Sequence, residues 1–111
     1  MGEIYEDRRQ EPRFNTIGKY ALDAGKAGNV EGRILDLSLN GAMLERTGNT
    51  ELTAGDRHRL TLEFQGQPPF QGDALLVYVG GNRIGIEFYD MDPQNFASLS
   101  ALIEALTRAN R

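Results

Sequence analysis

Three arginines near the N-terminus form a compact cluster of positive charge. Arg8, Arg9 and Arg13 lie within six residues, on a segment without an apolar pattern that would fold it locally. Guanidinium groups grip phosphate oxygens in pairs and stack on flat rings, so the cluster suits an anionic, planar partner. Pro12 restricts the residue before it to extended geometry and stiffens the turn into Arg13. The alternative is a solvated charged tail in which nearby carboxylates neutralise the arginines, namely Glu6, Asp7 and Glu11.

A second candidate segment, Asp36–Gly41, lies between two predicted strands. The carboxylate of Asp36 can accept hydrogen bonds from N1 and N2 of a guanine, and the hydroxyl of Ser38 can donate to a phosphate or base acceptor. Gly41 permits either a positive φ or a close approach of backbone. The same residue types also occur in ordinary turns, so this segment alone does not establish a site.

The remaining candidates for chemistry have structural explanations. His58 is the only histidine, and we expect it to be an exposed residue of a strand. Asp90 and Asp92 resemble the entry to a helix, whereas Gly80-Gly81 resembles a hairpin turn because a strand follows it. The sequence therefore offers no catalytic set and no metal site, and it predicts that the protein is not an enzyme.

Composition limits the classes of protein that need to be considered. The 111 residues suffice for one domain, and 40% of them are hydrophobic. The absence of cysteine excludes disulfides and favours a cytoplasmic location. We find neither an apolar leader nor a run long enough for a membrane-spanning helix. The net charge of −4 argues against binding to a nucleic acid polymer, although ten of the twelve basic residues are arginine.

Hydrophobic alternation and turn residues predict a small antiparallel barrel or sandwich. The strand 58–64 alternates most clearly, with Leu60, Leu62 and Phe64 on one face. In the strand 30–37, strict alternation predicts that Val30, Gly32, Ile34 and Asp36 share one face. The predicted strands cover residues 16–22, 30–37, 42–45, 58–64, 70–79 and 84–88.

A C-terminal helix is predicted over residues 93–109. Asp92 is a good N-cap, and a proline follows it at the first helical position. One apolar stripe runs along this helix, made of Phe96, Leu99, Ile103 and Leu106. We expect the stripe to pack on the barrel, with a subunit interface as the alternative. The domain division that follows is an N-terminal arm, residues 1–15, and a barrel with its helix, residues 16–111.

The two candidate segments together resemble the PilZ domain family. Arg9 to Arg13 fits R-x-x-x-R, and Asp36 to Gly41 fits D-x-S-x-x-G, with one predicted strand between the motifs. The segment Ile84–Phe88 and the helix after it are similar to the closing strand and C-terminal helix of the family. The resemblance covers roughly residues 6–107.

The resemblance implies a six-stranded antiparallel β-barrel (PilZ-like) that binds cyclic di-GMP. By position, Arg9 and Arg13 would hold phosphates and guanine faces, while Asp36, Ser38 and Gly41 would line the guanine side. An arginine at the position of Arg8 implies two stacked ligand molecules per chain. Further candidate ligand contacts are Asn40, Tyr78 and Gly85. The ring of Tyr78 could stack on a guanine, or it could pack under the last hairpin or the helix.

The implied role is that of a stand-alone receptor and adaptor without a cofactor. Residues 1–13 have no apolar period, so we expect the arm to be mobile until ligand phosphates tie its arginines to the barrel. The rearranged surface would then signal to a partner protein, which the sequence does not identify. The alternative is a PilZ-like subunit that binds other proteins, for example in pilus assembly, and no nucleotide. A small RNA-binding barrel is disfavoured by the acidic charge.

Overall fold

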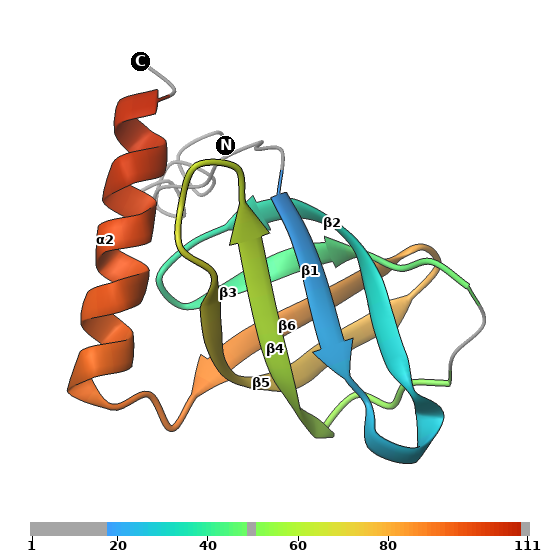
Figure 1. The fold of residues 1–111 in the computed structure, drawn as a ribbon. Coiled ribbons are helices and arrows are strands. Elements are labelled where there is room, and N and C mark those ends of the chain that lie inside the picture. Colours follow the sequence, from blue (N-terminus) through green and yellow to red (C-terminus); the bar gives the residue numbers. More distant parts are fainter. Residues whose placement is uncertain (1–17, 49–50, 110–111) are drawn as a thin grey trace, which may run out of the picture.

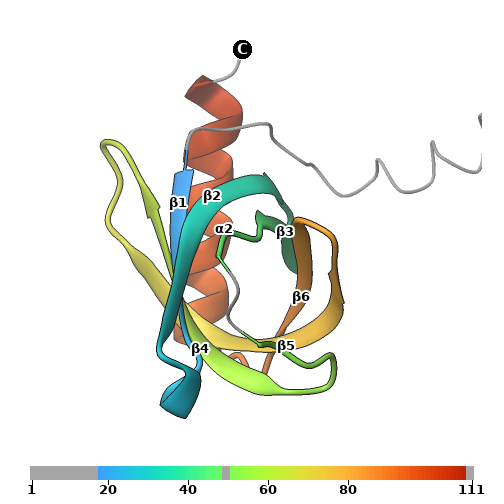
Figure 2. The same ribbon diagram turned by 90° about the vertical axis from the view of Figure 1, so that its right-hand side faces the viewer.

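The computed structural model describes residues 18–48 and 51–109, which form a closed barrel with one long helix beside it (Figure 1). Around the barrel the strands follow the order β1-β2-β3-β6-β5-β4, and every neighbouring pair is antiparallel. Figure 2 looks into this barrel. The elements are β1 (Gly18–Asp23), η1 (Gly25–Ala27), β2 (Asn29–Leu37), β3 (Gly41–Glu45), β4 (Arg57–Phe64), β5 (Phe70–Gly80), β6 (Arg83–Tyr89) and α2 (Pro93–Ala109). The predicted six-stranded antiparallel barrel with a C-terminal helix is confirmed.

The barrel interior is filled by the apolar residues that alternate along each strand. In β4, Leu60, Leu62 and Phe64 point inward and are buried, as their spacing predicts. Each fully buried leucine or phenylalanine contributes roughly 1.5–3 kcal/mol relative to the exposed side chain. This interior fixes which face of each strand points outward, and therefore which residues can form a surface site.

A β-bulge in β2 reverses the face that strict alternation predicts for Asp36. Ile34 pairs with Leu44 and Asp36 pairs with Met43, so the register shifts by one residue between them. Leu37 is consequently fully buried, whereas Asp36 is half-buried on the outer side. The prediction that Asp36 shares a face with Ile34 was wrong, because an extra residue in one strand changes the parity of all that follow.

The helix α2 packs against its own barrel, and its neighbour there is β5. Asp92 is the predicted N-cap, and its Oδ1 accepts a hydrogen bond of 2.7 Å from the backbone N–H of Asn95. Phe96 is 50% exposed, so its expected place in the buried stripe was wrong. The other three members of the stripe, Leu99, Ile103 and Leu106, are buried against the barrel, which leaves little of the stripe for a subunit interface. Leu102, which the predicted stripe did not include, is buried with them.

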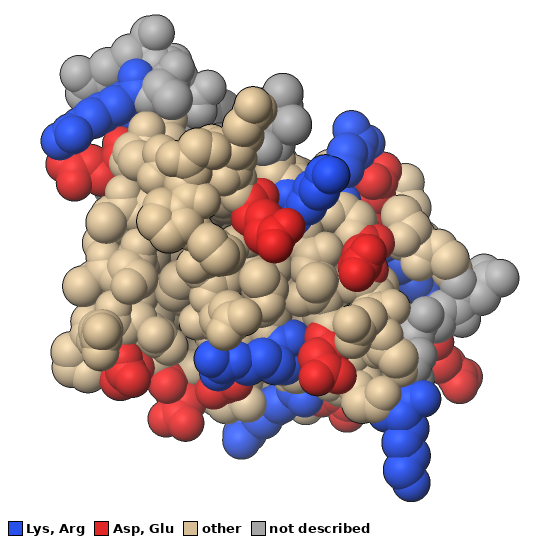
Figure 3. All heavy atoms as spheres, in the orientation of Figure 1, with Lys and Arg blue, Asp and Glu red and all other residues tan. Residues whose placement is uncertain are grey.

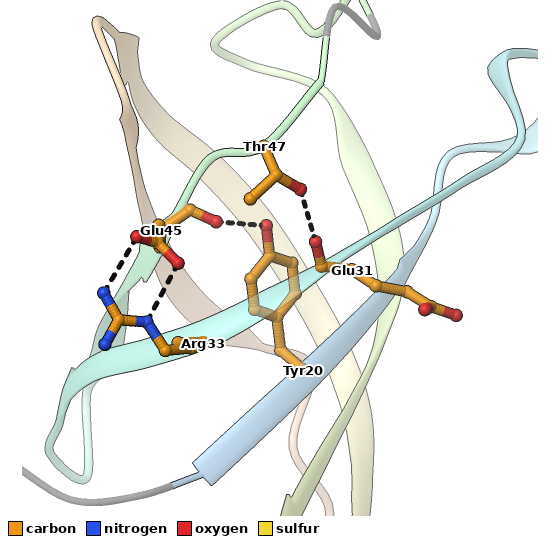
Figure 4. A network of polar contacts seen from close by, with 5 residues as sticks. All are labelled: Tyr20, Glu31, Arg33, Glu45 and Thr47. Carbon is orange, nitrogen blue, oxygen red and sulfur yellow. Dashed lines mark hydrogen bonds and ion pairs between the residues drawn. The ribbon is translucent and has the colours of Figure 1, made fainter.

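Tyr20 ties β1 to the end of β3 across β2 (Figure 4). Its hydroxyl donates a 2.6 Å hydrogen bond to the backbone carbonyl of Glu45. Burial, followed by the negative charge of Glu45, raises the pKa of Tyr20 to about 12, so the hydroxyl remains a donor at neutral pH. Gly32 leaves the space for this bond, because a Cβ atom there would lie 2.8 Å from the Glu45 carbonyl oxygen.

Two further contacts join β2 to β3 and the segment that follows it (Figure 4). Arg33 donates to both carboxylate oxygens of Glu45, at 3.0 and 2.9 Å, and this pairing holds the pKa of the Glu45 carboxyl below its usual range. Thr47 donates from its hydroxyl to the carbonyl of Glu31 at 2.7 Å. These contacts hold β3 in place, and the candidate site is built on its opposite end.

Candidate functional site

The turn between β2 and β3 is organised around the buried side chain of Ser38. The Ser38 hydroxyl oxygen accepts from the backbone N–H groups of Asn40 and Gly41, at 3.3 and 3.4 Å. The hydroxyl lies 3.4 Å from the Gly41 carbonyl, to which it donates, and the Ser38 N–H donates to the same carbonyl at 2.9 Å. Ser38 is only 5% exposed. In this arrangement Ser38 shapes the turn, and its expected contact with a ligand stays a prediction.

Gly41 is required here by close packing of the backbone. It pairs with Glu87 of β6, and a Cβ atom at position 41 would overlap the carbonyl oxygen of Ile86. Its φ is not among the positive values found in the chain. Of the two reasons considered for this glycine, the structure therefore supports the close approach.

A trough of about 350 Å³ lies on the outside of the barrel, over β2, β3 and β6. It brings together five of the residues proposed from the sequence, which are Asp36, Ser38, Asn40, Gly41 and Gly85. Its other lining residues were not proposed, and they are Ala42, Met43, Val77, Ile86 and Glu87. The proposed Arg8, Arg9 and Arg13 lie outside the described residues.

Gly85 lines the trough at a point where three strands run side by side. Met43 of β3 pairs with Gly85 of β6, which in turn pairs with Tyr78 of β5. Gly85 has no side chain, although a Cβ atom there would lie 3.3 Å from that of Tyr78 and 3.7 Å from the methyl of Met43. Gly85 therefore offers space between neighbouring apolar groups, which could receive a planar ring.

Tyr78 stands beside the trough and is not among its lining residues. A second bulge, between Leu76 and Tyr78, turns Val77 and Tyr78 outward, and they are 46% and 52% exposed. The Tyr78 ring extends toward Gly80, where a Cβ atom would lie 2.8 Å from its hydroxyl oxygen. The ring is therefore at the surface, over the last residue of β5, and is not buried beneath the hairpin or the helix.

The charge of the trough is acidic within the part of the chain that the structure describes. Asp36 and Glu87 are the only ionisable residues among its described lining, which includes neither lysine nor arginine. Elsewhere, the face in Figure 3 carries acidic and basic side chains that are interspersed without a broad basic area. Phosphates of a ligand in the trough would need cations from outside the described lining.

Other residues considered from the sequence take structural roles. His58 is half-buried, and its buried Nε2 has no hydrogen-bond partner among the described residues, so the expectation of an exposed histidine was wrong. Asp90 adopts a positive φ of 53° in the connection to α2. Within residues 18–48 and 51–109, no three candidate ligands are grouped to hold a metal. The same residues include no helix with the length and apolarity that crossing a bilayer requires.

Several solved structures share this fold. The PilZ domain of YcgR from Escherichia coli, solved with c-di-GMP, has a TM-score of 0.82 and 20% identity, over 94% of this chain and 95% of that one. YcgR from Escherichia coli in complex with c-di-GMP has a TM-score of 0.78 and 22% identity, over 94% and 48% of the two chains. The inhibitor of motility MotI/DgrA from Bacillus subtilis has a TM-score of 0.70 and 14% identity, over 91% and 52%.

The present chain spans about half the length of the latter two proteins. No curated protein matches the sequence. The family model of the PilZ domain matches residues 7–105, which is nearly the whole sequence. This chain therefore belongs to the PilZ domain family.

Proposed function

We propose that this protein is a receptor for cyclic di-GMP. The observation that carries the proposal is the outer trough, on which the residues of the D-x-S-x-x-G motif converge from β2, the turn and β3. Membership of the PilZ family and the shared fold with c-di-GMP complexes of YcgR support the same ligand. The ligand has guanine edges rich in donors, which suit Asp36, and phosphates, which suit arginines.

The proposed site joins the trough to the arginine motif. Asp36 accepts from a guanine, the space at Gly85 receives a ring, and Arg9 and Arg13 hold phosphates. Arg8 supplies a further cation, so that two stacked ligand molecules, with four phosphates, bind to each chain. The proposed protein is a receptor and not an enzyme, so no catalytic step follows the binding of the ligand.

Isothermal titration calorimetry tests this proposal directly. We expect cyclic di-GMP to bind with a ratio near two per chain, and near one in Arg8→Ala, because the second molecule loses the cation that offsets its charge. GTP and a short single-stranded RNA serve as controls and should bind far more weakly. No binding of cyclic di-GMP would favour a PilZ-like interaction subunit, and a ratio near one in the parent would contradict the paired ligand.

Tyr78 gives a second prediction, because this exposed residue pairs with Gly85, which lines the trough. Stacking of a base on an aromatic side chain is worth roughly 1–3 kcal/mol. Tyr78→Leu, which keeps apolar bulk and removes the flat ring, should therefore weaken binding by about 5- to 150-fold. Phe96→Leu, on the exposed side of α2, is the control and should bind as the parent does. Equal affinity of Tyr78→Leu and the parent would show that the ring does not stack on the ligand.

We further propose that the bound ligand repositions the N-terminal arm, and that the altered surface is read by a partner protein in the cytoplasm. A ligand can drive such a change only to the extent that it binds one arrangement more tightly than the other. Backbone NMR order parameters of residues 2–13, with and without cyclic di-GMP, test the change. Identical values in both states would contradict it.

A further inference from the structure

Glu87 is an acidic residue in the trough that the family motifs leave unassigned. It lies on the outer face of β6, two residues after Gly85, and it pairs with Gly41. Gly41 and Glu87 both line the trough. Among the described residues we find no hydrogen bond or ion pair to its carboxylate, and the side chain is exposed.

Glu87 and Asp36 flank the trough from opposite sides. Asp36 belongs to β2 and Glu87 to β6, and β3 lies between these strands. Neighbouring strands are about 4.8 Å apart, so the two backbones are separated by roughly 10 Å. Asp36 pairs with Met43, whereas Glu87 pairs with Gly41, so the two acidic residues lie diagonally across β3. Each carboxylate therefore has room for a base edge of its own.

A carboxylate in this position is unfavourable for an anionic ligand unless it accepts specific hydrogen bonds. Simple repulsion between Glu87 and a phosphate would weaken binding. Guanine, however, presents the N1–H and N2–H donors side by side, and an ionised carboxylate accepts both. Adenine presents an acceptor at N1, which would face the carboxylate without a proton. The Glu87 carboxylate thus stabilises a bound guanine and destabilises a bound adenine at this position.

We propose that Glu87 is a specificity-determining residue that reads the second guanine of the same ligand molecule whose first guanine Asp36 contacts. This inference rests on the proposed function, because it assigns a residue of the same site. Asp36 and Glu87 then act on different guanines of the ligand, and the trough selects cyclic di-GMP over dinucleotides in which adenine replaces guanine.

The test combines one substitution with two ligands. Glu87→Gln removes the charge and places an amide against the guanine donors. It should weaken binding of cyclic di-GMP by about 10- to 100-fold, the range for a hydrogen bond to a charged group. The hybrid cyclic GMP–AMP with the same ring linkage can place its single guanine at Asp36. Calorimetry should therefore show a smaller effect of Glu87→Gln on the hybrid. The fold-loss of affinity for the hybrid should be at least ten times smaller than the fold-loss of affinity for cyclic di-GMP.

The matched control is Glu63→Gln, which removes an exposed carboxylate from β4, outside the trough. It should bind both ligands as the parent does. Tighter or equal binding of cyclic di-GMP by Glu87→Gln would overturn the inference, since the carboxylate would then only repel the ligand. Equal losses for both ligands would also overturn it. If the parent itself does not bind cyclic di-GMP, the proposed function fails as a whole, which is a different result.

Discussion

Asp36→Ala is expected to bind cyclic di-GMP roughly 30- to 5,000-fold more weakly than the parent. The carboxylate is proposed to accept two hydrogen bonds from a guanine, each worth roughly 1.5–3 kcal/mol because the acceptor is charged. Their joint loss leaves both guanine donors unpaired and is comparable to the roughly 2–5 kcal/mol for breaking a buried hydrogen-bonded charge pair. The bulge in β2 turns this carboxylate outward, so its loss should leave the barrel core intact. Calorimetry measures the affinity, and thermal unfolding followed by circular dichroism verifies the fold.

Arg9→Ala and Arg13→Ala should show losses in the same range, because each removes a proposed phosphate contact. Arg83→Ala is the matched control, since Arg83 is an exposed residue of β6 that does not line the trough. It changes the net charge equally and should retain the parental affinity. Parental binding by all three site variants would mean that the ligand, if any, binds elsewhere on the molecule.

The second large effect is on stability. Gly41→Ala should lower the free energy of unfolding by about 1–3 kcal/mol, which corresponds to a fall of roughly 5–20 °C in melting temperature. The added methyl would overlap the Ile86 carbonyl oxygen and lie 3.2 Å from the Glu87 Cα, and backbone atoms cannot move aside as a flexible side chain can. β3 and β6 would have to separate at the point where the trough is formed.

Gly85→Ala provides the comparison for this prediction. Its new methyl would meet the Tyr78 Cβ at 3.3 Å and side-chain methyl groups at 3.7 Å, so the contact is tight but is made with side chains. We expect a smaller loss of stability than in Gly41→Ala. Should Gly41→Ala melt at the parental temperature, the close approach of β3 and β6 at this position would not be a constraint.

Local periodicity predicted the strands well, because a closed barrel gives each strand one buried and one exposed face. The alternation of Leu60, Leu62 and Phe64 placed β4 within a residue of its observed start. Strict alternation predicted the wrong face for Asp36, because no feature of the local sequence indicates the extra residue of the bulge. Helical periodicity also placed Phe96 in the buried stripe, but this residue lies in the helix outside the core.

The membership of the site was harder to predict than the fold. Alternation in β6 places Glu87 on the same outer face as Gly85, so this part was readable from the sequence. Its position across β3 from Asp36 depends on pairings between strands that are far apart in the chain. Val77 lines the trough because the bulge in β5 turns it outward, which local periodicity did not predict. Long-range register therefore decides which outward residues become neighbours.

Because β2 and β5 each contain a bulge, the number of residues in these strands determines which side chains face outward, as much as the residue types do. Deleting Leu35 would remove the bulge and restore uninterrupted alternation, with Ile34 and Leu37 still inward and Asp36 still outward. A strand of the same length without the bulge would instead turn Asp36 inward. The same holds for Val77 and the residues after it in β5. In comparing or grafting such sites, a single inserted or missing residue at these two points outweighs many substitutions. A sequence alignment that misses such an extra residue would match an outward-facing residue of the site with a buried residue of the core.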